Sequence, residues 1–449
     1  MNERTQRLEG EPQSANNTLF EKIFHLRAHG TNVRTEVIAG ATTFFTMCYT
    51  LLVTSGLMSQ AGMDKGAVFV ATCLVAIVGC LLMAFLANYP IAVAPGVGLL
   101  GYFAFSVIIG SGVPWQTALG AVFISGVLYA VISLFKLRDW IIESIPDSLR
   151  IGLSGGIGLF LAFIALRNSG ILVANQATLV SLGNVVSLHS LLALLGFFLV
   201  IAFESRRIKG GVLLSIIIIT IIGLVMGDIN YHGIVSLPPS LSPTFMQLDL
   251  MGALQPDMIS IILTLLLIAI FNDVGTLLAI GDTYPDMKTK QGKMPRIGRA
   301  LFSSGATSVF ASFFGTPTAA VYAENFAGVS AGGRTGLTAF TIAILFALAL
   351  LFSPVAEMVP NYATAGALLF IAVLMMGGLA RVDWLDLTEA APAVVTTAMI
   401  PLSSSISDGL GLGFISYVVI KVVSGRFRQI PIGCWVLAIV FLLKFIFLH

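Results

Sequence analysis

The chain has 449 residues, of which 57% are hydrophobic and only 10% are charged. Roughly a quarter of the residues of a soluble globular domain are charged, so this chain has too few charges to cover a water-facing surface. The composition argues against a soluble enzyme, a nucleic-acid binder and a disordered scaffold. It favours an all-α polytopic protein in a lipid bilayer.

The four cysteines lie within apolar stretches, and the five histidines lie outside these stretches or at their ends. Neither residue type forms a cluster with the spacing of metal ligands, so we expect no metal site and no cofactor. Residues 1–35 are polar and mixed in charge, and they contain no apolar segment of the kind found in signal peptides. We therefore expect residues 1–35 to be a cytoplasmic tail.

Apolar runs of helical length follow one another along the rest of the chain. We expect fourteen membrane-spanning segments, near 36–58, 66–88, 90–108, 116–136, 148–167, 188–204, 211–227, 258–281, 299–315, 317–330, 335–352, 361–380, 391–404 and 408–424. A straight spanning helix needs about 20 residues, and the third and tenth segments are shorter or broken. A further apolar run, 431–448, is either a fifteenth span or a helix packed on the flank.

Basic residues predict the orientation of these segments, because Lys and Arg favour the cytoplasmic side of a membrane. They gather in the N-terminal tail and after the fourth, sixth and eighth spans, as Arg4, Arg7, Lys22, Arg27, Arg34, Lys136, Arg138, Arg150, Arg206, Arg207, Lys209, Lys288, Lys290, Lys293, Arg296 and Arg299. The loop 228–257 has no Lys or Arg. The alternation predicts a cytoplasmic N-terminus and an even number of spans in the cytoplasmic (inner) membrane.

Two unusual segments occupy matching places in the two halves of the chain. They are 91–105 (IAVAPGVGLLGYFAF) and 315–328 (GTPTAAVYAENFAG), and each joins Gly and Pro to a short apolar half-helix. Each is the third segment of a seven-segment half, and an odd number of spans makes the second half an inverted repeat of the first. Because broken backbone at membrane depth is tolerated only inside protein or along a wet cavity, we expect both segments to converge on a mid-membrane ligand site. A pair of simple Pro kinks is the alternative.

Only two acidic residues, Asp273 and Glu324, lie well inside the apolar runs. Charged groups at membrane depth are costly and are usually functional. An acid without a basic neighbour can carry a proton, so each is a candidate both for substrate binding and for proton coupling. The alternative is a carboxyl group that bonds a neighbouring helix. Glu36 and Lys421 lie at the ends of runs, where we expect them to reach water.

Polar and aromatic residues near these acids and in the first and third spans complete the candidate site. They are Asn272, Thr276, Thr318, Tyr322, Gly98, Leu100, Thr43 and Phe44. Such groups can bond the edges of a flat heterocycle or stack on its face. The glycine-rich stretch 151–158 has no Lys and runs into an apolar helix, which favours close helix packing over phosphate binding. No Ser-His-Asp set, HExxH or GxSxG motif occurs, so we do not expect an enzyme.

At these residues the chain resembles the AzgA-like purine permeases, a branch of the nucleobase–cation symporter and nucleobase–ascorbate transporter group. The resemblance covers about residues 28–430 and is closest to the adenine-permease subgroup. Its strongest motifs are 29–31 (HGT), 145–152 (IPDSLRIG), 327–339 (AGVSAGGRTGLTA), 362–367 (YATAGA) and 380–384 (ARVDW). The sequence departs from the family at one acid. The family usually has the pattern F-D-x-x-G-T, whereas residues 271–276 of this chain read FNDVGT, with Asn272 at the position of the family's Asp and an acid one residue later, at Asp273.

The resemblance implies a seven-plus-seven inverted repeat with two domains. A core domain would comprise 36–136 and 258–352, a gate domain would comprise 148–227 and 361–424, and 431–449 would be an extra C-terminal helix. It also implies proton-coupled uptake of a purine base, with adenine favoured and Glu324 carrying the proton.

Several alternatives stay open. They are the same fold with another heterocycle or a small organic anion as substrate, and a receptor-like paralogue that binds without transport. A homodimer also stays open.

Overall fold

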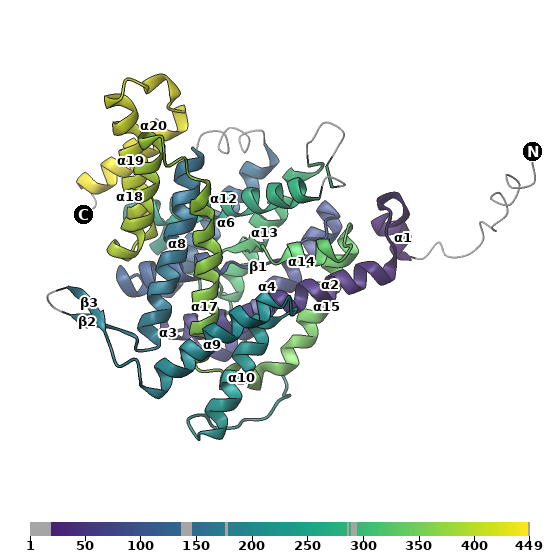
Figure 1. Cartoon of the computed structure of the whole chain (residues 1–449). Helices are drawn as coiled ribbons and strands as arrows, with labels where there is room; N and C mark the ends of the chain where they lie inside the picture. The colour runs from purple at the N-terminus through teal and green to yellow at the C-terminus, as the bar shows by residue number, and fades with distance from the viewer. Residues whose placement is uncertain (1–18, 136–145, 176–177, 285–286, 289–293, 448–449) are drawn as a thin grey trace, which may run out of the picture.

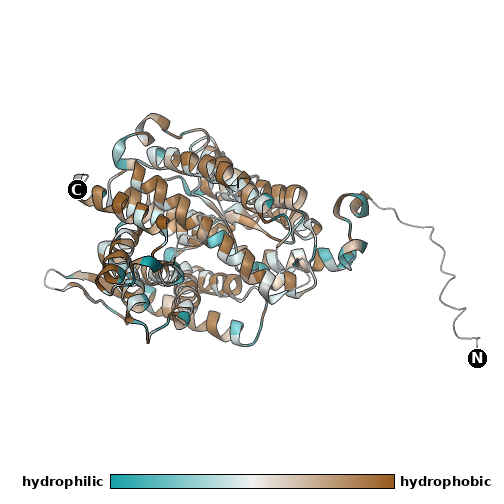
Figure 2. Cartoon of the chain, turned by 90° about the horizontal axis from the view of Figure 1, so that it is seen from above, coloured by the Kyte–Doolittle hydropathy of each residue, from teal (hydrophilic) through white to brown (hydrophobic). Residues whose placement is uncertain are grey.

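The computed structural model describes residues 19–135, 146–175, 178–284, 287–288 and 294–447. Residues 1–18 of the predicted tail, together with Lys136, Arg138, Lys290 and Lys293, lie outside these residues. The described chain is mostly helical, and Figure 2 shows that apolar residues predominate along the helical ribbons. This distribution fits a protein whose helices face lipid as well as one another.

The helices of the first half follow the predicted spans. They are α1 (Leu19–Phe24), η1 (Arg27–His29), α2 (Val33–Met47), α3 (Tyr49–Gln60), α4 (Lys65–Leu82), η2 (Met83–Ala87), α5 (Val97–Gly101), η3 (Tyr102–Gly110), α6 (Trp115–Leu134), α8 (Asp147–Asn168), α9 (Leu188–Ser205) and α10 (Gly211–Val225). Several begin at a capping side chain, because Asn32 accepts a hydrogen bond from Thr35 N and Asp64 accepts one from Ala67 N.

The second half repeats this pattern. Its helices are α11 (Leu250–Ala253), η4 (Pro256–Met258), α12 (Ile259–Thr283), α13 (Ile297–Phe314), α14 (Asn325–Ser330), α15 (Gly336–Ala349), η6 (Leu350–Phe352), α16 (Ser353–Met358), α17 (Asn361–Met376), η7 (Gly377–Arg381), α18 (Leu387–Ser403), α19 (Ile406–Val423), η8 (Phe427–Gln429) and α20 (Ile432–Phe447). Among the described residues, nine helices are long and apolar enough to cross a membrane. The other predicted spans fall on helices that are shorter, broken or more polar.

The helices pack in two groups (Figure 1). In the first, which we call the core group, α13 packs on α4 and α6, α15 packs on α2 and α4, and α12 packs on α6. In the second, which we call the gate group, α8 packs on α17 and α18, α9 packs on α10 and α17, and α18 packs on α19. Each group therefore combines helices from both halves of the chain, as an inverted repeat requires.

Glycines on α8 allow the close packing within the gate group. A side chain at Gly152 would meet the backbone of Ala393 on α18, and one at Gly158 would meet Met375 on α17, both at less than 3 Å. The stretch 151–158 is thus a helix-packing surface, as predicted from its sequence.

Two short strands join the two broken segments at the centre of the molecule (Figure 1). Strand β1 (Val93–Pro95) pairs antiparallel with β4 (Ala319–Val321), with Ala94 opposite Ala320. Gly315 ends α13 with a φ of +92°, a conformation that turns the chain toward β4 and favours glycine. The matching segments meet as predicted, although the sequence did not indicate that they would do so as strands. A second antiparallel pair of strands, β2 (Leu172–Asn175) and β3 (Leu179–Leu182), was likewise unexpected.

Helix α20 runs antiparallel along α19 (Figure 1). The rings of Phe414 and Phe441 stack at a centroid distance of 6.2 Å, and Lys444 pairs with Asp408 at 2.5 Å. The C-terminal apolar run therefore forms a helix that packs on the flank of the gate group.

Two charged residues that we expected to reach water are instead buried. Glu36 is fully buried and accepts hydrogen bonds from the hydroxyl and backbone N–H of Thr338 at the start of α15. Lys421 is only 2% exposed, and its Nζ lies 2.7 Å from a carboxylate oxygen of Glu389. The expectation was wrong because helices that are distant in sequence cover both run ends and supply partners for their charges.

Candidate functional site

A cavity of about 440 Å³ lies between the core group and the gate group. This volume is within the range of about 300–1,000 Å³ that is typical of small-molecule sites. The core group contributes Tyr49 from α3, Gly96–Leu99 at the start of α5, one face of α12 and residues 320–326. The gate group contributes residues of α8, α17 and η7, among them Arg150, Ser154, Ile157, Met375 and Arg381.

Glu324 is the acidic residue that lines the cavity. It directly precedes α14 and is partly exposed, and its Oε1 accepts a hydrogen bond of 2.5 Å from the Tyr49 hydroxyl. The described residues give this carboxylate no ion-pair partner within 4 Å, and its second oxygen makes no other hydrogen bond with them. Glu324 can therefore bond a ligand in the cavity, and it can do so protonated or ionised.

Asn272 and Asp273 are consecutive on α12 but have different surroundings. Asn272 is exposed on the cavity wall, and its amide donates to the carbonyl of Val321 at 2.9 Å. Asp273 is fully buried behind the wall, where it accepts hydrogen bonds from Val321 N at 2.7 Å and from the Tyr129 hydroxyl at 2.8 Å. One helical step of about 100° thus separates a residue that faces the cavity from one that holds β4 in place.

Hydrogen bonds from the ends of the two strands fix the inner wall. Asn325 donates to the carbonyl of Ala92 at 3.1 Å and accepts from Ala92 N at 2.7 Å, so one side chain bridges the two broken segments. The Tyr322 hydroxyl donates to the carbonyl of Pro95 across the same junction. These three bonds satisfy backbone groups that a broken helix leaves unpaired at membrane depth.

The structure places five of the predicted substrate-binding residues on one cavity. These are Glu324, Asn272, Thr276, Tyr322 and Gly98. They come from the eighth, tenth and third segments, which lie far apart in the sequence. Phe271 and Tyr322 present aromatic surface to the same space.

The other predicted residues do not line this cavity. Asp273 is held behind the wall, and Thr318 and Leu100 are almost fully covered on the far sides of their segments. Thr43 is buried beside Gly328, and Phe44 packs edge-on against Phe346 at 5.1 Å. Nearness in sequence to an acid or a proline therefore does not by itself place a side chain on this cavity, because successive residues of a helix point about 100° apart.

Several residues of the cavity were not among the predicted ones. Tyr49 is the partner of Glu324, yet the two residues are 275 positions apart in the sequence. The gate wall, with Ser154, Arg150 and Arg381, was also not predicted. Arg150 and Arg381 both fall in family-like motifs, which was the one sequence signal that marked them. Within the described part of the chain, no group of three or more His, Cys, Asp or Glu side chains could hold a metal ion.

Two helix groups, two broken segments paired at the centre and a cavity between the groups define a multi-pass membrane transporter of the seven-plus-seven fold. Solved structures agree with this fold. The transmembrane domain of the cyanobacterial bicarbonate transporter BicA matches with a TM-score of 0.65 over 86% of this chain and 97% of that chain, at 18% identity. The anion transporter Slc26a9 of mouse matches with a TM-score of 0.64 over 94% of this chain and 74% of that chain, at 14% identity.

The sequence then gives the family. Residues 34–412 match the model of the Permease family, and the chain belongs to that family. It is 45% identical to the adenine permease AdeP of Escherichia coli K12, over 97% of this chain and 98% of that protein. It is 38% identical to the guanine/hypoxanthine permease PbuO of Bacillus subtilis 168, over 94% and 99% of the two chains. The protein is thus a transporter and not an enzyme.

Proposed function

We propose that this protein takes up a purine nucleobase, with adenine favoured, and that the base binds in the cavity beside Glu324. The observation that carries the proposal is the combination of full-length similarity to two adenine permeases, at 45% and 44% identity, with a cavity of suitable chemistry. A purine is flat and neutral, and it carries hydrogen-bonding groups along its edges. The cavity offers a carboxyl group, an amide and four aromatic side chains, with mostly apolar walls.

In the proposed complex the base lies between the broken segments and the gate wall. Glu324 and Asn272 bond its edges, and Tyr322 or Phe271 contacts its face. Thr276 and Gly98 complete the site, Thr276 as a further polar group and Gly98 as a position where the backbone approaches the ligand. Asp273, Thr318, Leu100, Thr43 and Phe44 support this wall from behind or lie elsewhere.

Proton coupling would run through Glu324. Its carboxyl group faces the cavity, and its one partner among the described residues is the hydroxyl of Tyr49, which can donate to the ionised acid or accept from the protonated one. A substrate that bonds the protonated form would bind a proton together with the base. Asp273 has no such freedom, because its bonds to Val321 and Tyr129 are buried within the core group.

Transport would require the two helix groups to move against each other. We propose that they correspond to a core domain (36–136 and 258–352) and a gate domain (148–227 and 361–424). The N-terminus would be cytoplasmic, as the basic loops indicate. The protein would lie in the inner membrane. Arg150 and Arg381 line the cavity and would lie on the cytoplasmic side in this orientation. The described conformation would therefore be open to the cytoplasm.

Uptake of radiolabelled adenine by cells that lack other purine permeases tests the proposal. We expect the cells to accumulate adenine, and we expect an uncoupler or excess unlabelled adenine to prevent this. Hypoxanthine, guanine, uracil and a small organic anion, each added as a competitor, then measure the substrate preference. Absence of adenine accumulation by a correctly inserted protein would contradict the function. Accumulation that an uncoupler leaves unchanged would contradict the coupling alone.

A further inference from the structure

The cavity is lined by two positively charged side chains that a neutral base does not require. Three of its lining residues are charged, namely Glu324, Arg150 and Arg381. Glu324 belongs to the core wall, whereas both arginines belong to the gate wall. A purine base offers edges and a face but no anionic group, so two guanidinium groups beside it need another explanation.

Packed elements place the two arginines on the same wall of the cavity. Arg150 lies in the first turn of α8, and Arg381 is the last residue of η7. Helix α8 packs directly on η7, because Gly155 allows close contact with Leu379. Both side chains line the same cavity, so the two guanidinium groups share one space. Two like charges brought together at the edge of a cavity form a ready site for an anion.

Of the two arginines, Arg150 has one acidic partner and Arg381 has none among the described residues. Arg150 donates from Nη2 to Asp147, a residue whose side chain is 75% exposed, and its other donors make no hydrogen bond with the described residues. Arg381 is exposed and makes no hydrogen bond or ion pair within the described ranges. The preference of basic residues for the cytoplasmic side explains their side of the membrane. It does not explain why both line the cavity.

We propose that the cavity also binds a purine nucleoside 5′-monophosphate from the side that bears Arg150 and Arg381, and that this ligand inhibits transport. The inference rests on the proposed function, because the base of the nucleotide would occupy the nucleobase site beside Glu324 and Asn272. Its phosphate would lie between the two guanidinium groups, whose planar donor pairs match phosphate oxygens. The N-terminus of the 22-residue helix α8 adds a favourable dipole at the same place.

Inhibition follows from where the two ends of the nucleotide bind. The base would contact the core group and the phosphate would contact the gate group, so one ligand would bridge the two parts that must move for transport. A purine base that enters a cell is consumed by reactions that attach it to ribose phosphate. Their product would thereby limit further uptake of the base.

Displacement of radiolabelled adenine from the purified full-length protein tests the inference. The probes are adenosine 5′-monophosphate, adenosine, which has the same base and sugar without the phosphate, and inorganic phosphate. We expect the monophosphate to displace adenine at a concentration about ten-fold lower than adenosine does, and added salt to remove that advantage. Equal displacement by adenosine and its monophosphate would overturn the inference.

Variants locate the phosphate. Arg150→Gln, Arg381→Gln and the double variant should lose the advantage of the monophosphate over adenosine stepwise, measured as a ratio within each variant so that any change in adenine affinity cancels. Arg381→Lys should retain most of it, and Arg206→Gln, which changes an exposed arginine outside the cavity, should retain all of it. An advantage that persists in the double variant would overturn the site. Adenine binding by each variant shows that it is folded.

Two further readouts separate this inference from the proposed function. If adenine does not bind at all, the nucleobase function fails, and an arginine-dependent rise in melting temperature with the monophosphate would still support the anion site. In oriented membrane vesicles, the monophosphate should inhibit adenine transport from the cytoplasmic face and should not itself cross. Transport of radiolabelled monophosphate would contradict its role as an inhibitor.

Discussion

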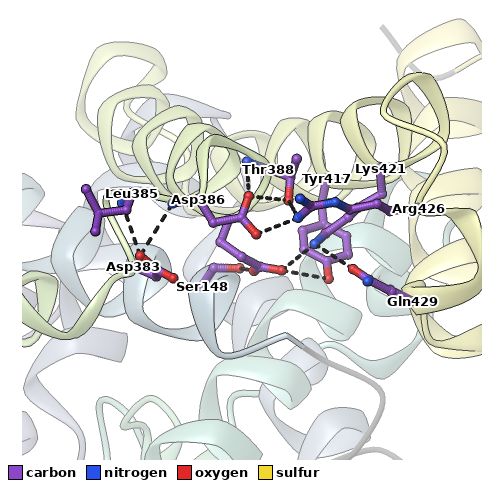
Figure 3. Close-up of polar contacts among 10 residues, drawn as sticks. Ser148, Asp383, Leu385, Asp386, Thr388, Tyr417, Lys421, Arg426 and Gln429 are labelled. Carbon is purple, nitrogen blue, oxygen red and sulfur yellow. Dashed lines mark hydrogen bonds and ion pairs between the residues drawn. The ribbon is translucent and has the colours of Figure 1, made fainter.

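Two carboxylates, in different parts of the molecule, have opposite surroundings. Glu324 in the core group faces the cavity, and its one partner among the described residues is Tyr49. Glu389 in the gate group bonds Lys421 at 2.7 Å and Ser148 at 2.6 Å, and Figure 3 shows Lys421 directed into this cluster together with Tyr417 and Gln429. An acid with a full set of partners fixes the positions of helices, whereas an acid with an open side is free to bind a ligand or a proton.

The cluster around Glu389 also shows how the gate wall is held. Ser148 lies in the first turn of α8, so its bond to Glu389 on α18 fixes the end of the helix that carries Arg150. Nearby, Arg426 pairs with Asp386, the N-cap residue of α18 (Figure 3). The comparison predicts that changes at Glu324 alter transport in a folded protein, and that changes at the cluster alter folding first.

The largest effect on transport is expected for Glu324→Gln. Glutamine keeps the shape and can still bond Tyr49, but it cannot take up or release a proton. We expect proton-driven accumulation of adenine to fall by about 100-fold or more, which corresponds to about 3 kcal/mol, with a normal melting temperature. Asp257→Asn, a change to an exposed acid in η4, is the control. Full accumulation of adenine by Glu324→Gln would contradict the view that Glu324, unlike Glu389, takes part in transport.

The largest effect on stability is expected for Lys421→Met, because it leaves Glu389 without its ion-pair partner. Removal of one member of a buried pair costs about 3–5 kcal/mol, and the partial exposure of Glu389 places this pair at the lower end. Adding Glu389→Leu should restore most of the loss, since both charges are then gone. The melting temperatures of the single and double variants check this. A single variant as stable as the original protein would show that the cluster has no structural role.

A smaller effect on transport is expected for Asn272→Asp. The amide donor to Val321 is lost, and an acid is placed beside Asp273 on the same core wall of the cavity as Glu324. We expect a change of about ten-fold in apparent affinity for adenine or in its preference over hypoxanthine, which is the worth of about one hydrogen bond to a charged group. The competition profile measures it, and an unchanged profile would show that residue 272 does not contact the substrate.

The smallest effect is expected at Asp386, on the surface of the gate group. Hydrogen bonds from the hydroxyl and backbone N–H of Thr388, together with Arg426, lower the pKa of Asp386 to about 2. A lowered pKa means that this acid stabilises the fold above its ordinary pKa of about 3.9 and loses the effect as the pH falls toward 2. Asp386→Asn should therefore lower the melting temperature slightly and equally at pH 7 and pH 5. A difference in melting temperature between the variant and the original protein that grows below pH 4 would contradict this.

The sequence predicted the inverted repeat because composition and proline placement are local signals. Pro95 and Pro317 marked two broken segments, and these pair as β1 and β4. Glu324 stood out as an acid at membrane depth. Contacts between distant segments leave no such signal, which is why Tyr49 and the gate arginines were not predicted. Side-chain direction was equally hidden, since Asn272 and Asp273 differ by a single helical step.

Protection of introduced cysteines by substrate tests the location of the site most directly. The four native cysteines are buried, so thiol labelling of the folded protein should report on an introduced residue. Val97 and Thr276 line the cavity, whereas Leu100 and Thr318 lie in the same region and are covered. Adenine should slow labelling of cysteine placed at Val97 or Thr276 and should leave Leu100 and Thr318 unaffected. Unchanged labelling at both cavity positions, in protein that still binds adenine, would place the substrate elsewhere.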